Sequence, residues 1–254
     1  MDTKFVHAIY FSPARSTRKI VRAIALGISE RINDHDITLG INEDIELSEK
    51  DIVVIGVPSY SGRVPELAKK YLSEIRGNGA SAIIVCVYGN RDYEDTLLEL
   101  KEICTINKFR VTSAAAFIAR HSMFPNIAAG RPNTTDLNQA TDFGKKSLHS
   151  ILQNQTISTG IKGNNPYRDV KAIPLKPKAN SKCDSCGTCA KLCPVCAISK
   201  ENPRKTDKKR CISCAGCIEI CPQKARSFTG FVYKIARRQF SKKYNSRKEN
   251  EFIF

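Results

Sequence analysis

The chain has 254 residues, 41% of them hydrophobic, which is enough for one full-sized domain and a second small one. No apolar run approaches the ~20 residues of a membrane-spanning helix, and the polar residues among the first nine are not expected in a secretory signal. The net charge of +16 is concentrated late in the chain. Residues 161–230 carry 15 basic and 5 acidic side chains (+10) and residues 231–254 carry 7 and 2 (+5), so +1 remains for residues 1–160.

Strand and helix patterns alternate along the first 155 residues. Short apolar runs rich in β-branched residues, typical of strands buried on both faces, are followed by apolar residues at helical spacing. Such alternation predicts an α/β domain with a doubly wound parallel sheet of five strands. The predicted strands are residues 4–10, 37–41, 51–57, 81–88 and 111–119, and the predicted helices follow residue 17 and cover about 66–75, 94–108 and 136–153.

Three loops follow strands of this predicted sheet, at residues 11–17, 58–63 and 88–93. Ligands of doubly wound sheets bind beyond the carboxyl ends of the strands. The first loop has Ser and Thr at the start of a helix, where free backbone N–H groups and the helix dipole favour an anion, although an ordinary helix cap has the same pattern. The other two loops carry Tyr60 and Tyr93 beside glycines. The sequence therefore predicts a site for a flat anionic cofactor.

Nine of the 11 cysteines lie between residues 183 and 221, where the run C-x2-C-x2-C-x3-C-P occurs twice, 28 residues apart. This spacing is that of bacterial ferredoxins with two 4Fe-4S clusters. Three cysteines at two-residue intervals wrap one face of a cluster, and the fourth, after a longer step, is directed at the other cluster. We therefore assign Cys183, Cys186, Cys189 and Cys221 to one cluster, and Cys211, Cys214, Cys217 and Cys193 to the other. The ninth, Cys196, is expected to be a small buried thiol beside them.

Two other uses of these cysteines are weaker interpretations. A zinc ribbon takes two C-x2-C pairs per ion and has no use for a third cysteine in each run. A disulfide framework is disfavoured because no secretory signal is expected. Cysteines that bind metal rather than pair with each other fit a reducing compartment, so the cytoplasm is the expected location.

Three stretches, 10–20, 62–65 and 87–93, resemble the flavin loops of a flavodoxin domain. With the cysteine runs behind them, the chain resembles the flavodoxin–ferredoxin fusion proteins of anaerobic bacteria and archaea, over residues 4–155 and 183–225. The resemblance implies a flavodoxin-like sheet of order 2-1-3-4-5 that binds FMN, followed by a small α+β two-cluster ferredoxin domain. The implied divisions are 1–155 for the first domain, 156–180 for a linker, 181–230 for the second domain and 231–254 for a basic, aromatic C-terminal tail.

The resemblance also implies which residues contact FMN. The phosphate is expected at the first loop and the isoalloxazine ring at the other two. The implied residues are Ser12, Ala14, Arg15, Ser16 and Thr17 for the phosphate, and Pro58, Ser59, Tyr60, Ser61, Gly62, Tyr88, Gly89, Asn90 and Tyr93 for the ring.

The first loop departs from the usual flavodoxin pattern, Ser-x-Thr-Gly-x-Thr. Ala14 and Arg15 stand where that pattern has threonine and glycine, so one hydroxyl donor is lost and a glycine is replaced. If Arg15 pairs with the phosphate, it compensates for the loss. If Arg15 instead blocks the loop, the fold remains without its cofactor.

These patterns predict an electron-transfer protein that passes electrons between FMN, two 4Fe-4S clusters and protein redox partners. The partners are expected to be acidic, because the last third of the chain is basic. No catalytic residue is predicted. Two alternatives stay open: a flavoenzyme that reduces a small molecule at FMN, with His121 and Tyr93 as the first residues to test, and nucleic-acid binding by the basic third with the clusters structural.

Overall fold

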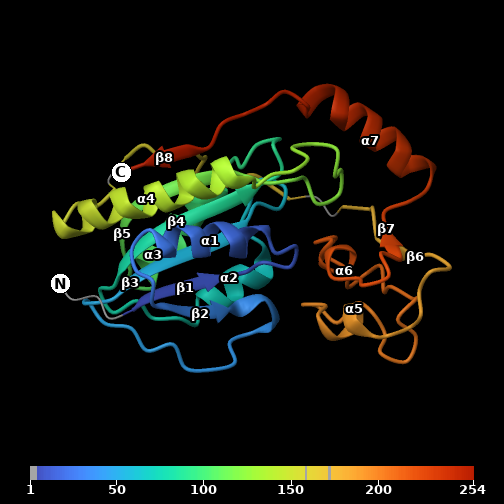
Figure 1. The fold of residues 1–254 in the computed structure, drawn as a ribbon, viewed down its shortest axis with the longest axis horizontal. Coiled ribbons are helices and arrows are strands. Elements are labelled where there is room, and N and C mark those ends of the chain that lie inside the picture. Colours follow the sequence, from blue (N-terminus) through green and yellow to red (C-terminus); the bar gives the residue numbers. More distant parts are fainter. Residues whose placement is uncertain (1–4, 158, 171–172) are drawn as a thin grey trace.

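The computed structural model describes residues 5–157, 159–170 and 173–254. Its larger part is built on a six-stranded sheet of order β2-β1-β3-β4-β5-β8 (Figure 1). The first five strands are parallel, which confirms the predicted α/β class and the order 2-1-3-4-5, whereas β8 is antiparallel to β5. The strands are β1 (Val6–Tyr10), β2 (Ile32–Asp36), β3 (Ile52–Pro58), β4 (Ser81–Tyr88), β5 (Arg110–Ile118) and β8 (Glu251–Ile253).

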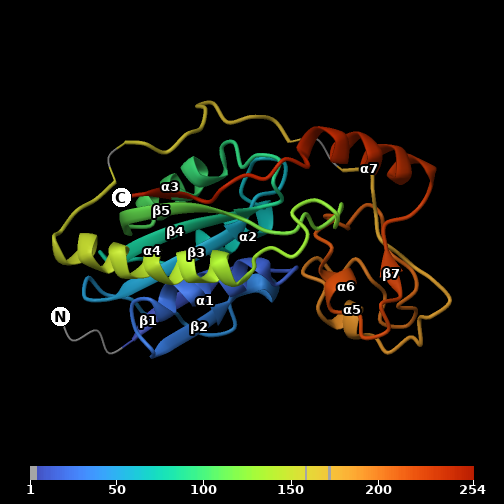
Figure 2. The ribbon, with the colours of Figure 1, turned by 45° about the horizontal axis from the view of Figure 1, so that its top comes forward.

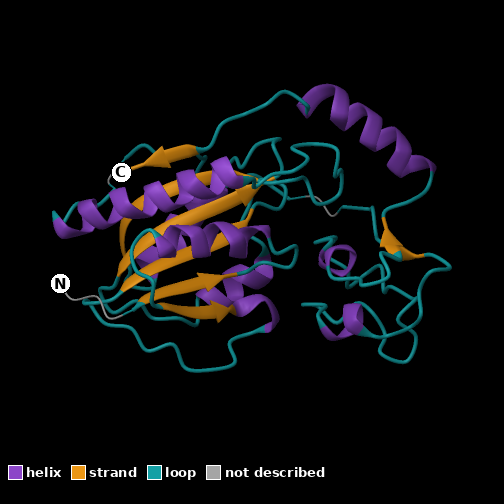
Figure 3. Cartoon of the chain, viewed as in Figure 1, coloured by secondary structure: helices purple, strands orange, loops and turns teal. Residues whose placement is uncertain are grey.

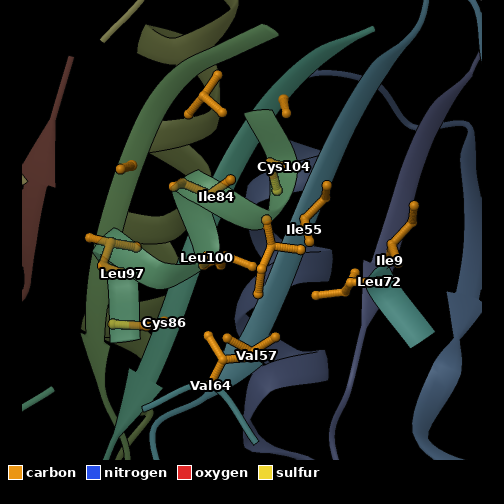
Figure 4. Close-up of a cluster of buried hydrophobic side chains, with 14 of the residues drawn as sticks. Ile9, Ile55, Val57, Val64, Leu72, Ile84, Cys86, Leu97, Leu100 and Cys104 are labelled. Carbon is orange, nitrogen blue, oxygen red and sulfur yellow. The ribbon is translucent and has the colours of Figure 1, made fainter. Parts of the chain in front are cut away.

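Helices cover both faces of this sheet (Figures 1 and 3). On one face lie α1 (Ser16–Leu26) and α4 (Thr134–Leu152), and on the other α2 (Glu66–Leu72) and α3 (Thr96–Ile106). Apolar side chains of α2 and α3 pack on those of β1, β3 and β4, as Figure 4 shows. Because both faces are covered, β3 and β4 are apolar along almost their whole length rather than alternating.

The second strand lies five residues before the predicted one. Residues 32–36, Ile-Asn-Asp-His-Asp, form β2 at the edge of the sheet, and the predicted strand 37–41 instead begins with a 3-10 turn, Ile37–Leu39. The Asp36 side chain accepts a hydrogen bond from the Thr38 backbone N–H (3.0 Å) and so starts that turn. An edge strand needs no continuous apolar run, so its polar sequence does not have the pattern of a buried strand.

The small second domain lies opposite the carboxyl ends of the parallel strands (Figures 1 and 2). Its two-stranded antiparallel sheet pairs β6 (Lys178–Ala179) with β7 (Arg226–Ser227). Two single-turn helices lie within the cysteine runs, α5 (Thr188–Lys191) in the first and α6 (Gly216–Glu219) in the second. The domain is α+β, as the resemblance implied.

Two segments connect the small domain to the sheet. The linker is held by Asp95, just before α3, which accepts hydrogen bonds from the backbone N–H groups of Asn164 (2.8 Å) and Arg168 (2.7 Å). Linker residues 158, 171 and 172 lie outside the described residues. The segment expected to be a tail instead returns to the sheet, through α7 (Phe231–Tyr244) and then β8 (Figure 1). None of the helices in the described ranges is long and apolar enough to cross a membrane.

Asn250 fastens the returning segment beside β5. Its side-chain oxygen accepts a hydrogen bond from the Ile118 N–H (2.9 Å), and its amide donates to Asp136 (3.0 Å) and Gln139 (2.6 Å). We expect Asn250→Ala to lower the free energy of unfolding by about 1–3 kcal/mol, because it leaves the N–H of buried Ile118 without its acceptor. The exposed neighbour Glu249, which forms an ion pair with Arg247, provides the matched control Glu249→Ala. Equal unfolding midpoints in denaturant for the two variants would show that Asn250 has no such role.

Candidate functional site

A cleft between the strand ends and the small domain contains three neighbouring hollows that share lining residues. The narrow central hollow is bounded by all three predicted flavin loops, by the loop after β5 and by one cysteine of the small domain, Cys214. Nine of the residues predicted to contact FMN line it: Ser12, Ala14, Ser16, Thr17, Pro58, Ser59, Tyr60, Tyr88 and Gly89.

The loop between β1 and α1 has the form of an anion-binding turn. The Ser12 N–H donates to the Thr38 hydroxyl (2.8 Å), and the Ser12 hydroxyl accepts from the Arg18 N–H (3.0 Å). Ser12 therefore already occupies the Arg18 N–H in the first turn of α1, while the N-cap residue Arg15 makes no side-chain hydrogen bond to the helix start. The N–H groups of Ser16 and Thr17, which begin the helix, are the backbone donors left for a ligand. Arg15 has φ 62°, in the left-handed region that glycine adopts without strain.

Four residues of the predicted flavin site do not line the hollows of this cleft: Arg15, Gly62, Asn90 and Tyr93. Arg15 is exposed and borders a separate hollow beside Asp36 and the small domain. The arrangement therefore does not favour a pairing of Arg15 with a phosphate in the central hollow.

Tyr93 and Asn90 hold the C-terminal segment instead. The Tyr93 ring is buried edge-on against Tyr88, and its hydroxyl donates to Glu251 in β8 (2.6 Å). The Asn90 amide donates to the backbone carbonyls of Tyr244 and Ser246, both at 2.8 Å. The loop after β4 thus has two roles: Gly89 lines the cleft, and Asn90 and Tyr93 bind the C-terminal segment.

Two larger hollows extend the central one, and Ser122 lines all three. One, of about 430 Å³, lies between Lys19, Arg120 and α6. The other, of about 360 Å³, lies beside Ser61, which was predicted to contact the ring, and is closed by residues of the linker, the small domain and α7. The loop after β5 contributes to every hollow, yet His121 is its only residue that the sequence singled out. The signal that could have found the others is the position of that loop at the carboxyl edge.

His121 presents a neutral imidazole to the 360 Å³ hollow. Its Nδ1 accepts hydrogen bonds from the backbone N–H groups of Met123 and Phe124, both at 3.2 Å, so the ring proton is placed on Nε2. Burial, and then the charge of Arg91, lower the pKa of His121 to about 4. The group is therefore a hydrogen-bond donor at neutral pH rather than a cation.

The two domains share an apolar core and a close backbone contact. The core consists of buried Phe124 and Ile127 from the loop after β5 and Ala215, Phe228 and Tyr233 from the C-terminal part. A Cβ atom on Gly216 would lie 2.9 Å from the Pro13 carbonyl oxygen, so only glycine lets α6 approach the first loop this closely. Arg120 and Glu219 add an ion pair (2.7 Å) across the contact.

Inside the small domain, Cys193, Cys211, Cys214 and Cys217 line one cavity together with apolar side chains. These are the four cysteines that the spacing assigned to one cluster. Four thiols in an apolar pocket are the donor set that suits an iron–sulfur cluster. Among the described residues, no three His, Cys, Asp or Glu side chains gather as a single metal ion would require.

The remaining predicted ligands are Cys183, Cys186, Cys189 and Cys221. Cys189 is buried, Cys186 is exposed and the other two are half-buried. Cys196, expected to be buried, is exposed. Its left-handed φ of 48° belongs to the turn after Cys193 and has its counterpart at Lys224.

The backbone repeats with the same 28-residue offset as the cysteines. Positive φ angles recur at Ser185 and Ser213, at Gly187 and Ala215, and at Cys196 and Lys224. The Ala197 N–H donates to Cys193 Sγ and the Ala225 N–H to Cys221 Sγ, both at 3.3 Å. Both fourth cysteines thus receive the same backbone donor.

The low pKa of His121 predicts a pH-dependent stability. An ordinary histidine titrates near pH 6.5, so between pH 6.5 and about 4 the unfolded chain binds a proton that the folded chain excludes. The contribution of His121 is therefore complete above pH 6.5 and is lost as the pH falls toward 4. We expect His121→Gln to flatten this part of the stability–pH curve, measured by denaturant unfolding, and the exposed His149→Gln to leave it unchanged. Parallel curves for the wild type and His121→Gln would contradict the prediction.

No protein-family model matches the chain, and no curated protein matches it. Several solved structures are similar. A flavodoxin from the domain Archaea has a TM-score of 0.44 and 12% identity, covering 58% of this chain and 99% of its own. The apo form of an NADH:FMN oxidoreductase has a TM-score of 0.42 and 16% identity, covering 62% and 92%. Rubredoxin oxygen:oxidoreductase from Desulfovibrio gigas has a TM-score of 0.42 and 15% identity, covering 60% and 37%.

Proposed function

We propose that the chain is an electron-transfer iron–sulfur flavoprotein. FMN would lie in the interdomain cleft and two 4Fe-4S clusters in the small domain, with protein redox partners as donor and acceptor. One observation carries the proposal: Cys214 lines both the central hollow and the cavity of the four cysteines. Cys214 thus borders both candidate cofactor sites, and electron transfer is fastest between centres that lie close together.

Side chains around the cleft offer the chemistry that FMN would need. The central hollow is only about 40 Å³, so the isoalloxazine ring would extend into the 360 Å³ hollow, which Tyr60 also lines. The start of α1 and the Ser12, Ser16 and Thr17 side chains offer donors for the phosphate at one end of the central hollow. Tyr60 stands at the other end. Burial, and then the nearby Cys214, raise the pKa of its phenol, so it stays neutral and can pack against a ring. When bound, FMN exchanges one or two electrons and each cluster one.

A second candidate function is the reduction of a small molecule at the flavin. The 360 Å³ hollow favours it, because the hollow shares Ser59, Tyr60 and Gly89 with the central one and is lined by His121, Arg91 and Arg168. A small ligand with an acceptor atom would fit there. Faster turnover of a small acceptor than of any carrier protein would favour this candidate over the first.

Replacement of Cys214 should remove one cluster without removing FMN. Protein purified without oxygen is expected to hold one FMN and eight irons. Cys214→Ala should lose the cluster of Cys193, Cys211 and Cys217 and keep its FMN, and electron exchange between flavin and iron should slow, as followed by stopped-flow absorbance. The control Cys196→Ala removes an exposed cysteine outside both sets and should retain eight irons. Wild-type protein that takes up neither iron nor FMN would refute the proposed function.

The small domain carries an exposed basic loop of Lys205, Lys208, Lys209 and Arg210, which we propose as the docking surface for an acidic redox partner. Replacing Lys208 and Lys209 with glutamine should lower the association rate by roughly tenfold at low salt and weaken its salt dependence. The double replacement of exposed Lys145 and Lys146 on α4 removes the same charge elsewhere and should change little. Equal effects of the two double variants, in stopped-flow reduction of an acidic carrier, would exclude this surface.

A further inference from the structure

One cation is buried inside the small domain without a carboxylate partner. Arg226, in β7, is 2% exposed. Its Nη1 donates to the Pro203 carbonyl (2.7 Å) and its Nη2 to the Thr206 hydroxyl. No ion pair within the described ranges includes Arg226, and its buried Nε–H has no acceptor among the described residues. A buried charge that lacks both a counter-charge and a full set of hydrogen bonds costs several kcal/mol.

The groups around this guanidinium are cysteines of both predicted cluster sets. Its Nη1 lies 3.8 Å from Cys189 Sγ, in the first set. Cys193 and Cys217, in the second set, pack against Cys189 in one cluster of side chains. Arg226 therefore lies where cysteines of the two sets meet, and an anionic group bound by either set would balance its charge.

The internal repeat shows that the position does not demand a cation. Twenty-eight residues earlier, in the matching sequence Ala197-Ile198-Ser199, the residue is Ile198, which is 5% exposed and packs against Cys189 and Ala190. The first run thus fills the position with an apolar side chain. The second run places a charge there, in the sequence Ala225-Arg226-Ser227.

We propose that Arg226 is a positioning residue that holds a positive charge between the two iron–sulfur clusters and raises their reduction potentials. The inference rests on the proposed cluster content. Net charge and hydrogen bonds to the sulfurs are among the factors that set cluster potentials. A 4Fe-4S cluster with four thiolates is anionic and becomes more so on reduction, so a nearby buried cation stabilises the reduced form. The unpaired Nε–H is a donor available to a cluster sulfur, which would also explain why the guanidinium is buried.

The test compares three variants of the full chain, purified without oxygen. Arg226→Met removes the charge but keeps a long apolar side chain, as the first repeat does with Ile198. Arg226→Lys keeps the charge but loses the planar donor set. Lys224→Gln removes one charge from an exposed residue two positions away and serves as the control. Iron per chain is counted, and midpoint potentials are measured by redox titration followed by electron paramagnetic resonance.

In Arg226→Met the midpoint potential of the cluster bound at Cys189 should become more negative than in the wild type. The shift should be larger than the one in Lys224→Gln. The midpoint potential in Arg226→Lys should lie between those of Arg226→Met and the wild type. If Arg226→Met cannot retain eight irons while Arg226→Lys does, the charge is required for assembly, which also supports the proposal. Equal potentials in Arg226→Met and Lys224→Gln would overturn it, as would loss of the clusters in Arg226→Met and Arg226→Lys alike. Wild-type protein without iron after anaerobic reconstitution would overturn the proposed function itself, and this inference with it.

Discussion

The arrangement of both candidate cofactor sites depends on the apolar core that the two domains share. Burial of Phe124, Phe228 and Tyr233 contributes about 1.5–3 kcal/mol for each ring. The ion pair of Arg120 and Glu219 across the same contact is partly exposed and adds about 0–1 kcal/mol. Hydrophobic burial therefore holds the small domain against the strand ends, and the ion pair only orients it. Cys214 keeps its place between the two cavities as long as this core remains packed.

The chain path reinforces that core from two sides. The linker enters the small domain after its hydrogen bonds to Asp95, and the C-terminal segment leaves it to pair with β5 through β8. Separation of the domains would therefore also break strand pairing and the contacts of Asn90 with the end of α7. A fixed geometry of this kind suits electron transfer between sites within one chain, because no domain motion is needed to bring them together.

The sequence predicted those parts of the fold in which local pattern and tertiary environment agree. The buried strands β3 and β4 are apolar throughout, so their positions and their parallel order were predictable. The polar edge strand β2 was misplaced, and β8, a three-residue strand, was missed, because its pairing with β5 joins residues far apart in the chain. The same long-range pairing explains why Tyr93, placed by loop position at the flavin, is instead hydrogen-bonded to Glu251. The cysteine spacing placed Cys193 with the second run, and Cys193 does line one cavity with Cys211, Cys214 and Cys217. The binding of clusters by these cysteines stays a prediction.

Departures between the two cysteine runs show how a duplicated unit becomes adapted to one neighbour. Where the first run has Gly187, the second has Ala215, which adopts a left-handed φ of 61° at a cost of about 1–2 kcal/mol. The methyl group of Ala215 is buried in the core shared by the domains, so burial offsets part of that strain. The next position changes in the opposite direction, from Thr188 to Gly216, because any side chain there would meet Pro13. Both exchanges lie on the surface of the second run that faces the sheet. The spacing of the cysteines does not require either exchange. The orientation of the small domain is therefore encoded in the residues between the cysteines, whereas the cysteines alone would permit either run to face the cleft.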